Sequence, residues 1–164
     1  MNSKKILLNV FYWLLVIIMM LVIVRFSLED GEKSSETSGG IVDVVVELLP
    51  NSENVTVEQK ENIGSNIRQL GHFGIYLLLA FFSSNALRGL FDKIMPYPLL
   101  LAFAMSLEFA LFDEFVVQAN TNGRAAEWSD IVTDMLGAVC GILIYDLLLN
   151  ILMNIIKLKK RRST

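Results

Sequence analysis

The sequence contains few of the residues from which covalent cross-links and metal sites are built. Cys140 is the only cysteine and His72 the only histidine in 164 residues. A disulfide within the chain and a zinc site with paired cysteines are therefore excluded. Lysines and arginines do not form a block interleaved with aromatic residues, which argues against a nucleic-acid partner. The sequence also has neither a GxSxG nucleophile motif nor a phosphate-binding P-loop.

Long apolar runs dominate the sequence instead. Apolar residues make up 54% of the chain and charged residues 19%, a composition typical of membrane proteins. About 20 apolar residues are needed to cross a bilayer, and four runs approach that length, at about residues 6–26, 71–90, 95–112 and 131–156. We therefore predict a single all-α domain over residues 1–164. Its expected architecture is a four-helix transmembrane bundle whose long first connection contains short interfacial helices.

The first run has features of a membrane span and of a cleavable signal sequence. Lys4 and Lys5 precede it, as basic residues do in a signal peptide. The apolar stretch is longer than the core of such peptides, however, and the segment FSLEDG follows in place of a small-residue cleavage site. We interpret the run as an uncleaved transmembrane helix.

The distribution of charge predicts the orientation of the spans. The N-terminus, the connection between the second and third spans, and the tail KLKKRR together hold nine of the 14 basic residues. Of the 17 acidic residues only two are expected on that side, Asp92 in the connection and Asp146 near the far end of the fourth run. Because basic residues stay on the cytoplasmic side of a membrane, we expect both termini to be cytoplasmic in a multi-pass protein of the cell membrane. The first connection and the segment after the third span then face outward.

The first connection, residues 27–67, is predicted to have two parts. SLEDGEKSSETSGG has the composition of a mobile or turn-rich segment. The following IVDVVVELL places apolar residues around a narrow acidic face, which is typical of a short helix on the membrane or against the bundle. Thr56 and Gln59 resemble a capping box, so a helix is expected to begin near Val57 and to continue into the second span.

Ionisable residues gather where the predicted helices reach the outer interface. Arg68, His72 and Tyr76 are four residues apart and therefore form one stripe on a helix. Ionisable groups at this depth face the bundle interior or a watery cavity, so we predict one outward-opening polar pocket with these three as ligand-binding residues. Six more ligand-binding residues follow the third span and enter the fourth: Asp113, Glu114, Gln118, Arg124, Asp130 and Asp134.

Several of these residues also have a simpler explanation. Arg68 can contact lipid phosphates, and His72 can serve as an interfacial anchor. Asp130 can cap the fourth helix, since a carboxylate before an apolar run accepts free backbone N–H groups. Gly137 and Gly141 lie on the same helical stripe as Asp130 and are typical of close helix packing.

Taken in order, these motifs resemble those of the VanZ-like family, the group named for a teicoplanin-resistance accessory protein. The resemblance runs from about Phe26 to Tyr145 and includes FS followed by DGEKSSETS, the segment RQLGHFGIYLLL, then DE, a glutamine, GR and DIVTDMLGAVCG. Two positions depart from the family pattern. Glu114 and Gln118 are four residues apart where the family commonly has three, and Asn122 stands where a proline usually precedes GR.

The resemblance implies a multi-pass envelope protein but no particular reaction, which leaves two hypotheses of different class. In the first, a non-enzymatic protein binds a membrane lipid, a cell-wall precursor lipid or a glycopeptide antibiotic in its pocket and lowers antibiotic sensitivity, with arginines gripping an anionic headgroup. In the second, an enzyme acts on a lipid-linked phosphate substrate, with His72, Glu114 and Asp130 as catalytic residues. A metal held by His72 and these carboxylates, or a transporter, is a weaker alternative. We expect no cofactor and no metal.

Overall fold

The apolar runs and most of the polar segments between them form helices. The computed structural model describes residues 3–48, 55–91 and 98–162, and within these ranges it contains no strand. The all-α prediction is confirmed. Five α-helices follow one another along the chain: α1 (Ser3–Ser27), α2 (Gly31–Glu47), α3 (Val57–Phe91), α4 (Pro98–Phe112) and α5 (Trp128–Arg162).

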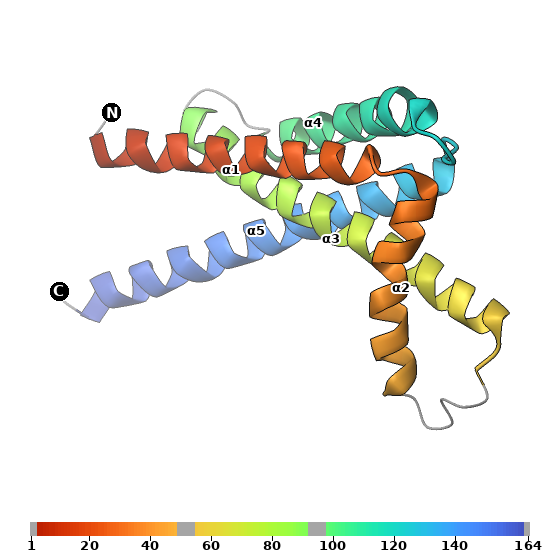
Figure 1. Ribbon diagram of the computed structural model, residues 1–164. Coiled ribbons are helices and arrows are strands. Elements are labelled where there is room, and N and C mark those ends of the chain that lie inside the picture. Colours follow the sequence, from red (N-terminus) through yellow and green to blue (C-terminus); the bar gives the residue numbers. More distant parts are fainter. Residues whose placement is uncertain (1–2, 49–54, 92–97, 163–164) are drawn as a thin grey trace.

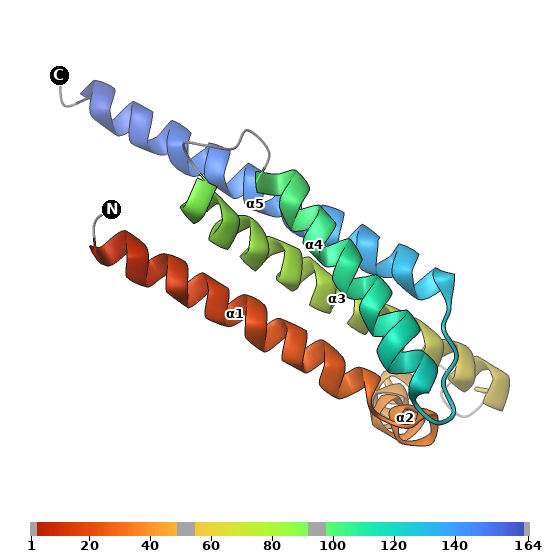
Figure 2. The same cartoon turned by 90° about the horizontal axis from the view of Figure 1, so that it is seen from above.

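Four of the helices form a bundle, and the remaining one crosses its end. The helices α1, α3, α4 and α5 run side by side in alternating directions (Figure 1, Figure 2). Both ends of the chain therefore lie at one end of the bundle, while α2 crosses the opposite end and packs against α3 (Figure 1). Among the described helices, α3 and α5 share the most extensive contact.

Three helices in the described ranges, α1, α3 and α5, are long and apolar enough to cross a membrane. Large exposed apolar side chains follow much of α1 and α5, as expected of helices that face lipid. Helix α4 has 15 residues and is therefore about 22 Å long, short of the bilayer core of about 30 Å. Length and composition thus support three of the four predicted crossings. Residues 95–97 of the predicted third span lie outside the described residues.

Two glycines set the distance between α3 and α5. A Cβ atom at Gly137 would collide with the backbone carbonyl of Phe73, and one at Gly141 with that of Leu77. The two helix backbones therefore touch without intervening side chains, as small residues allow in membrane bundles. The packing explanation of the glycine pair is confirmed.

Helix α3 begins where the capping box predicts. The Thr56 amide donates to Gln59 Oε1 over 2.9 Å, and the Gln59 amide donates to Thr56 Oγ1 over 3.3 Å. This reciprocal pair satisfies backbone groups that the first turn of a helix leaves free. From Val57 the helix continues for 35 residues, so the predicted polar stripe and the second span belong to one helix.

The prediction of a turn-rich segment after α1 is wrong for residues 31–40, because α2 begins at Gly31 and lasts 17 residues. The short helix predicted for IVDVVVELL is confirmed as far as Glu47, where α2 ends. Its buried positions Ser38, Val42 and Val46 recur every four residues and form one stripe. The helix packs against α3. Burial of this stripe outweighs the modest helix propensity of the serines and glycines, which tertiary packing commonly overrides.

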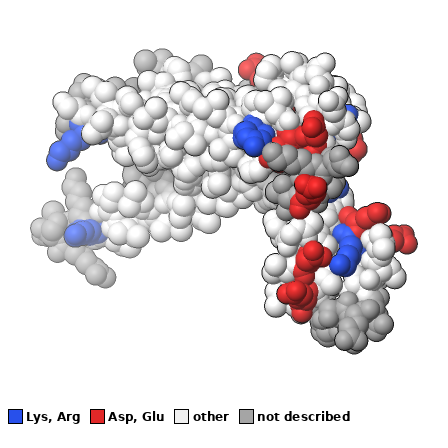
Figure 3. Space-filling model, in the orientation of Figure 1, with Lys and Arg blue, Asp and Glu red and all other residues white. Residues whose placement is uncertain are grey.

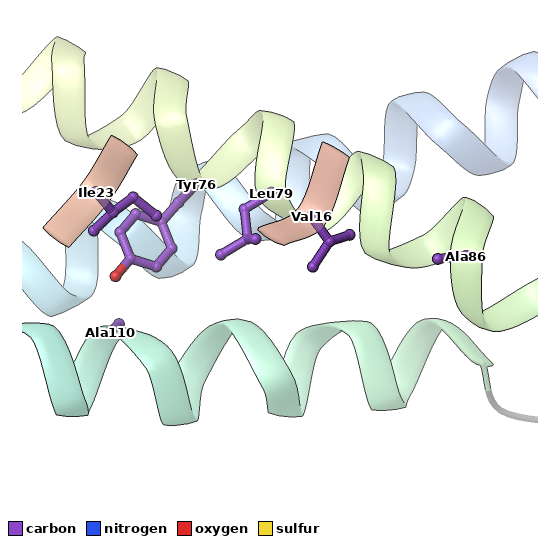
Figure 4. Close-up of a cluster of buried hydrophobic side chains, with 6 residues drawn as sticks. All are labelled: Val16, Ile23, Tyr76, Leu79, Ala86 and Ala110. Carbon is purple, nitrogen blue, oxygen red and sulfur yellow. The ribbon is translucent and has the colours of Figure 1, made fainter. Parts of the chain in front are cut away.

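The interior of the bundle is filled by apolar side chains from three helices. Val16 and Ile23 of α1 pack with Tyr76 and Leu79 of α3 and with Ala110 of α4 (Figure 4). Tyr76 is 1% exposed, and its hydroxyl points toward α4 (Figure 4). The apolar cluster thus fixes three helices next to the end of the bundle where the polar residues gather.

Candidate functional site

A pocket of about 450 Å³ lies at the end of the bundle that α2 crosses. Its walls come from the last turn of α1, from α2, from the N-terminal half of α3 and from the segment that connects α4 to α5. The polar stripe of the second span and the polar residues that follow the third span therefore meet in one place. Six of the nine predicted binding residues line this pocket: Arg68, His72, Tyr76, Gln118, Arg124 and Asp130.

The other three predicted residues, Asp113, Glu114 and Asp134, lie behind the pocket wall. Each of them is 1% exposed, and none lines the pocket. They contact residues that do line it, so the structure separates the predicted set into a pocket lining and a layer of buried carboxylates.

His72 and Asp134 link α3 to α5 at the pocket. His72 Nδ1 lies 3.2 Å from Asp134 Oδ1, and the close approach of the helices at Gly137, one turn further along α5, brings the two side chains together. Because Asp134 occupies Nδ1, Nε2 is the ring nitrogen left for a ligand. Glu114 and Asp130, the predicted catalytic partners, form no hydrogen bond with His72.

Two irregular turns follow α4, and the first of them carries the buried carboxylates Asp113 and Glu114. The turns are the π-helical turn η2 (Asp113–Val117) and the 3-10 turn η3 (Gln118–Asn120). Asp113 Oδ2 accepts a hydrogen bond from the Ser27 hydroxyl over 2.7 Å and one from Gln118 Nε2 over 3.4 Å. Burial raises the pKa of Asp113, and the hydrogen bond from Ser27 opposes that rise. The last residue of α1 is thereby tied to the buried carboxylates.

Glu114 orients Arg124 through Gln118. Glu114 Oε2 accepts a hydrogen bond from Gln118 Nε2 over 2.6 Å, and its Oε1 accepts one from the Glu127 backbone amide over 2.6 Å. Because the amide nitrogen of Gln118 is turned to the carboxylate, its Oε1 accepts a hydrogen bond from Arg124 Nη1, over 2.8 Å. Burial raises the pKa of Glu114, and the hydrogen bond from the Glu127 amide opposes that rise.

Both arginines of the pocket are held by neutral groups. Gln118 holds Arg124, and the Ser38 hydroxyl accepts a hydrogen bond from Arg68 Nη1 over 3.4 Å. In the described part of the chain, neither guanidinium lies within ion-pair distance of a carboxylate. Their positive charges are therefore available to a ligand.

Asp130 does not occupy the capping position that the simpler explanation gave it. Helix α5 begins at Trp128, so Asp130 lies within the first turn, where the helix dipole favours a carboxylate. The half-buried side chain lines the pocket and makes no hydrogen bond or ion pair with the described residues. The capping explanation is wrong, and the carboxylate is free to meet a ligand.

Two serines of this network were not among the predicted residues. Ser27 ends α1 and donates to Asp113, whereas Ser38 lies in α2 and accepts from Arg68. A signal for Ser27 was present, since FS after the first span is part of the family resemblance. Ser38 ends the segment DGEKSSETS, which also belongs to the resemblance, but that segment was expected to be turn-rich and was not placed beside the pocket.

The arrangement supports ligand binding and, through His72, proton transfer. The free N–H groups of two arginines, the Asp130 carboxylate and the imidazole all reach the pocket. Among the described residues, no group of three or more His, Cys, Asp or Glu side chains is placed to hold a metal ion.

Comparison with known proteins identifies one relationship. A family model described as VanZ/LLP1 matches residues 11–150. The match covers most of the chain and includes all nine predicted site residues. No curated protein and no solved structure matches the chain.

Proposed function

The chain belongs to the VanZ/LLP1 family, and from that membership and the pocket geometry we propose that it is a multi-pass protein of the cell membrane that binds the anionic headgroup of an envelope lipid. A lipid-linked cell-wall precursor has the same chemistry, a phosphate at the membrane surface, and belongs to the same class of ligand. By holding such a lipid, the protein lowers the sensitivity of the cell to glycopeptide antibiotics that act on the precursor.

In this proposal the bundle crosses the membrane four times, with α4 as the third crossing. Three crossings by α1, α3 and α5 alone would leave the chain ends on opposite sides, whereas they lie at the same end of the bundle (Figure 1). Acidic side chains gather over α2 and the N-terminal part of α3, and basic ones mark the end with the termini (Figure 3). The positive-inside rule then places both termini in the cytoplasm and the pocket outside.

The observation that carries the proposal is the presence of two guanidiniums without carboxylate partners in one pocket. Arg68 and Arg124 line it, and their described hydrogen-bond partners are neutral groups. An arginine presents a planar fork of donors that matches the oxygens of a phosphate. Gln118 holds one edge of Arg124, so that side chain is oriented before a ligand arrives.

The pocket also has an apolar wall, which favours a lipid over a soluble anion. Ile23 and Phe26 of α1 and Ile75 of α3 line it beside the polar residues. Both helices are long and apolar enough to cross the membrane. A lipid can therefore place its headgroup among the polar side chains while its chains follow the apolar wall into the bilayer.

A second function is supported by the contact between His72 and Asp134. The 3.2 Å separation of Nδ1 and Oδ1 fixes the imidazole with its other nitrogen available to the pocket. A histidine held in this way by a carboxylate can act as a general acid, general base or nucleophile. In this alternative the protein is an enzyme acting on the phosphate of a lipid-linked substrate, with the arginines stabilising the negative charge that develops during the reaction.

The two functions predict opposite results for two substitutions, Arg124→Lys and His72→Gln. Lysine keeps the positive charge but loses the fork, and glutamine keeps hydrogen bonding but cannot exchange a proton usefully. If the protein acts by binding a lipid headgroup, Arg124→Lys should lower its affinity for that headgroup by about tenfold or more, as expected for loss of a charged hydrogen bond, and should weaken resistance accordingly. His72→Gln should then be tolerated.

The assay is growth against teicoplanin of a deletion strain that expresses each variant, with membrane levels compared by immunoblot. Arg88→Lys is the matched control, because Arg88 lies in the last turn of α3, whereas the pocket is lined by the N-terminal half of that helix. The opposite result, in which His72→Gln abolishes resistance and Arg124→Lys retains it at equal membrane levels, would refute the binding proposal and support the enzymatic one.

A further inference from the structure

The pocket presents unpaired charges of both signs. Arg68 and Arg124 provide the positive charges, and the Asp130 carboxylate lines the same pocket without a hydrogen bond or ion pair among the described residues. A headgroup with a phosphate alone would satisfy the arginines and leave Asp130 beside another negative charge.

Asp130 sets the negative side of the pocket. Glu29 also lines it but is paired with Arg25, and Asp113, Glu114 and Asp134 lie behind the lining residues, each with hydrogen-bond partners of its own. Charges interact more strongly where water is excluded, so the half-buried Asp130 carboxylate opposes a ligand that is only anionic. A ligand with a positive group as well as a negative one avoids this repulsion.

Building on the function proposed above, we infer that the preferred ligand is a lipid whose headgroup joins a phosphate to an ammonium group, as phosphoethanolamine does. Arg68 and Arg124 hold the phosphate, and Asp130 accepts hydrogen bonds from the ammonium. Free phosphoethanolamine has the same chemistry. The apolar wall at Ile23 and Phe26 favours the lipid form.

In this arrangement the arginines supply affinity and Asp130 supplies selectivity. Every phospholipid has a phosphate for Arg68 and Arg124, so those contacts do not distinguish one headgroup from another. Asp130 attracts an ammonium and repels a purely anionic headgroup. Selectivity is the difference between these two affinities.

The experiment measures the affinity of the purified full-length protein in detergent micelles by calorimetric titration. The probes are dihexanoyl phosphatidylethanolamine, dihexanoyl phosphatidylglycerol and free phosphoethanolamine. The wild type should bind phosphatidylethanolamine about tenfold more tightly than phosphatidylglycerol, the scale of one charged hydrogen bond. Free phosphoethanolamine, which lacks the chains that follow the apolar wall, should bind more weakly than the lipid.

Two variants separate the roles, and a third serves as control. Asp130→Asn should remove the preference, because it weakens binding of the ethanolamine lipid and relieves the repulsion of phosphatidylglycerol. Arg124→Lys should weaken binding of both lipids. Asp146→Asn makes the same charge change on α5 far from the pocket, where its partner is Asn150, and should keep the preference. Thermal unfolding of each variant confirms that it is folded.

Each remaining outcome overturns a defined part of the reasoning. Equal affinity of the wild type for the two lipids, or an unchanged preference in Asp130→Asn, overturns the inference. The proposed function is kept in either case if the wild type binds the lipids and Arg124→Lys weakens that binding. Free phosphoethanolamine bound as tightly as the lipid overturns the assignment to a lipid. Failure of the wild type to bind either lipid overturns both the inference and the proposed function.

Discussion

Replacing Gly141 with alanine adds one methyl group where α3 and α5 approach most closely. The new Cβ would overlap a backbone carbonyl of α3, and Gly137→Ala would do the same one turn away. A backbone carbonyl cannot rotate aside as a flexible side chain can, so the helices themselves must separate. Because the His72–Asp134 contact lies one turn from Gly137 on the same helix, separation of the helices should also loosen the candidate site.

The expected cost follows from two opposing effects. Adding volume to a tightly packed interface costs about 1–3 kcal/mol. Alanine in a helix is favoured over glycine by about 0.5–1 kcal/mol. The net loss for Gly141→Ala should therefore be about 1 kcal/mol on central values and at most about 2.5 kcal/mol. In a chain of this length each kcal/mol lowers the melting temperature by about 2–4 °C.

Gly74→Ala is the matched control, and tryptophan fluorescence during heating in one detergent is the assay. Gly74 lies on α3, and a Cβ there would have no neighbour within 4 Å. Only the gain in helix propensity applies at this position, so the control should melt at the wild-type temperature or above it. If Gly137→Ala and Gly141→Ala melt with the control, the two helix backbones do not touch and the packing argument fails.

Two further predictions test the buried carboxylates and the orientation. Asp113→Asn keeps an acceptor for Ser27 and removes a carboxyl whose pKa burial raises. A raised native pKa stabilises the fold only while the group is protonated. The wild type should therefore lose stability relative to this variant as the pH rises above about 4, the pKa of a free Asp carboxyl, and a constant difference in melting temperature would contradict this. In a Cys140→Ser background, a cysteine at Asn120 should react with an impermeant maleimide on intact cells and one at Lys159 only after lysis. The reverse pattern would place the pocket in the cytoplasm.

Periodicity predicted the parts of the site that lie on regular helices. Arg68, His72 and Tyr76 line the pocket together, as their spacing of four requires. On the facing helix, Asp134 meets His72 beside the packed Gly137. A regular helix converts spacing in the sequence into direction in space, so the common face of Arg68, His72 and Tyr76 could be derived before any contact was known. The pairing of His72 with Asp134 could not, since the sequence indicated Glu114 and Asp130 as its catalytic partners.

Contacts between distant segments could not be derived in this way. The hydrogen bond from Ser27 to Asp113 joins residues 86 apart in the chain, and no local pattern pairs a serine at one helix end with a carboxylate after another. Helix α2 packs against α3, and its serine- and glycine-rich first half, residues 31–40, does not reveal that it is helical. The division between lining and buried carboxylates also follows from packing, since both groups come from the same polar segments.

The irregular turn after α4 accounts for a position at which the chain departs from its family. Four residues separate Glu114 from Gln118 where the family commonly has three, and η2 occupies this interval. A π-turn takes in one more residue than an α-turn, because its hydrogen bonds run from i to i+5. The additional residue is accommodated within that turn, so Gln118 still contacts Glu114 at 2.6 Å and Arg124 at 2.8 Å. The pocket depends on the direction of the Gln118 side chain, and in this chain the π-turn sets that direction.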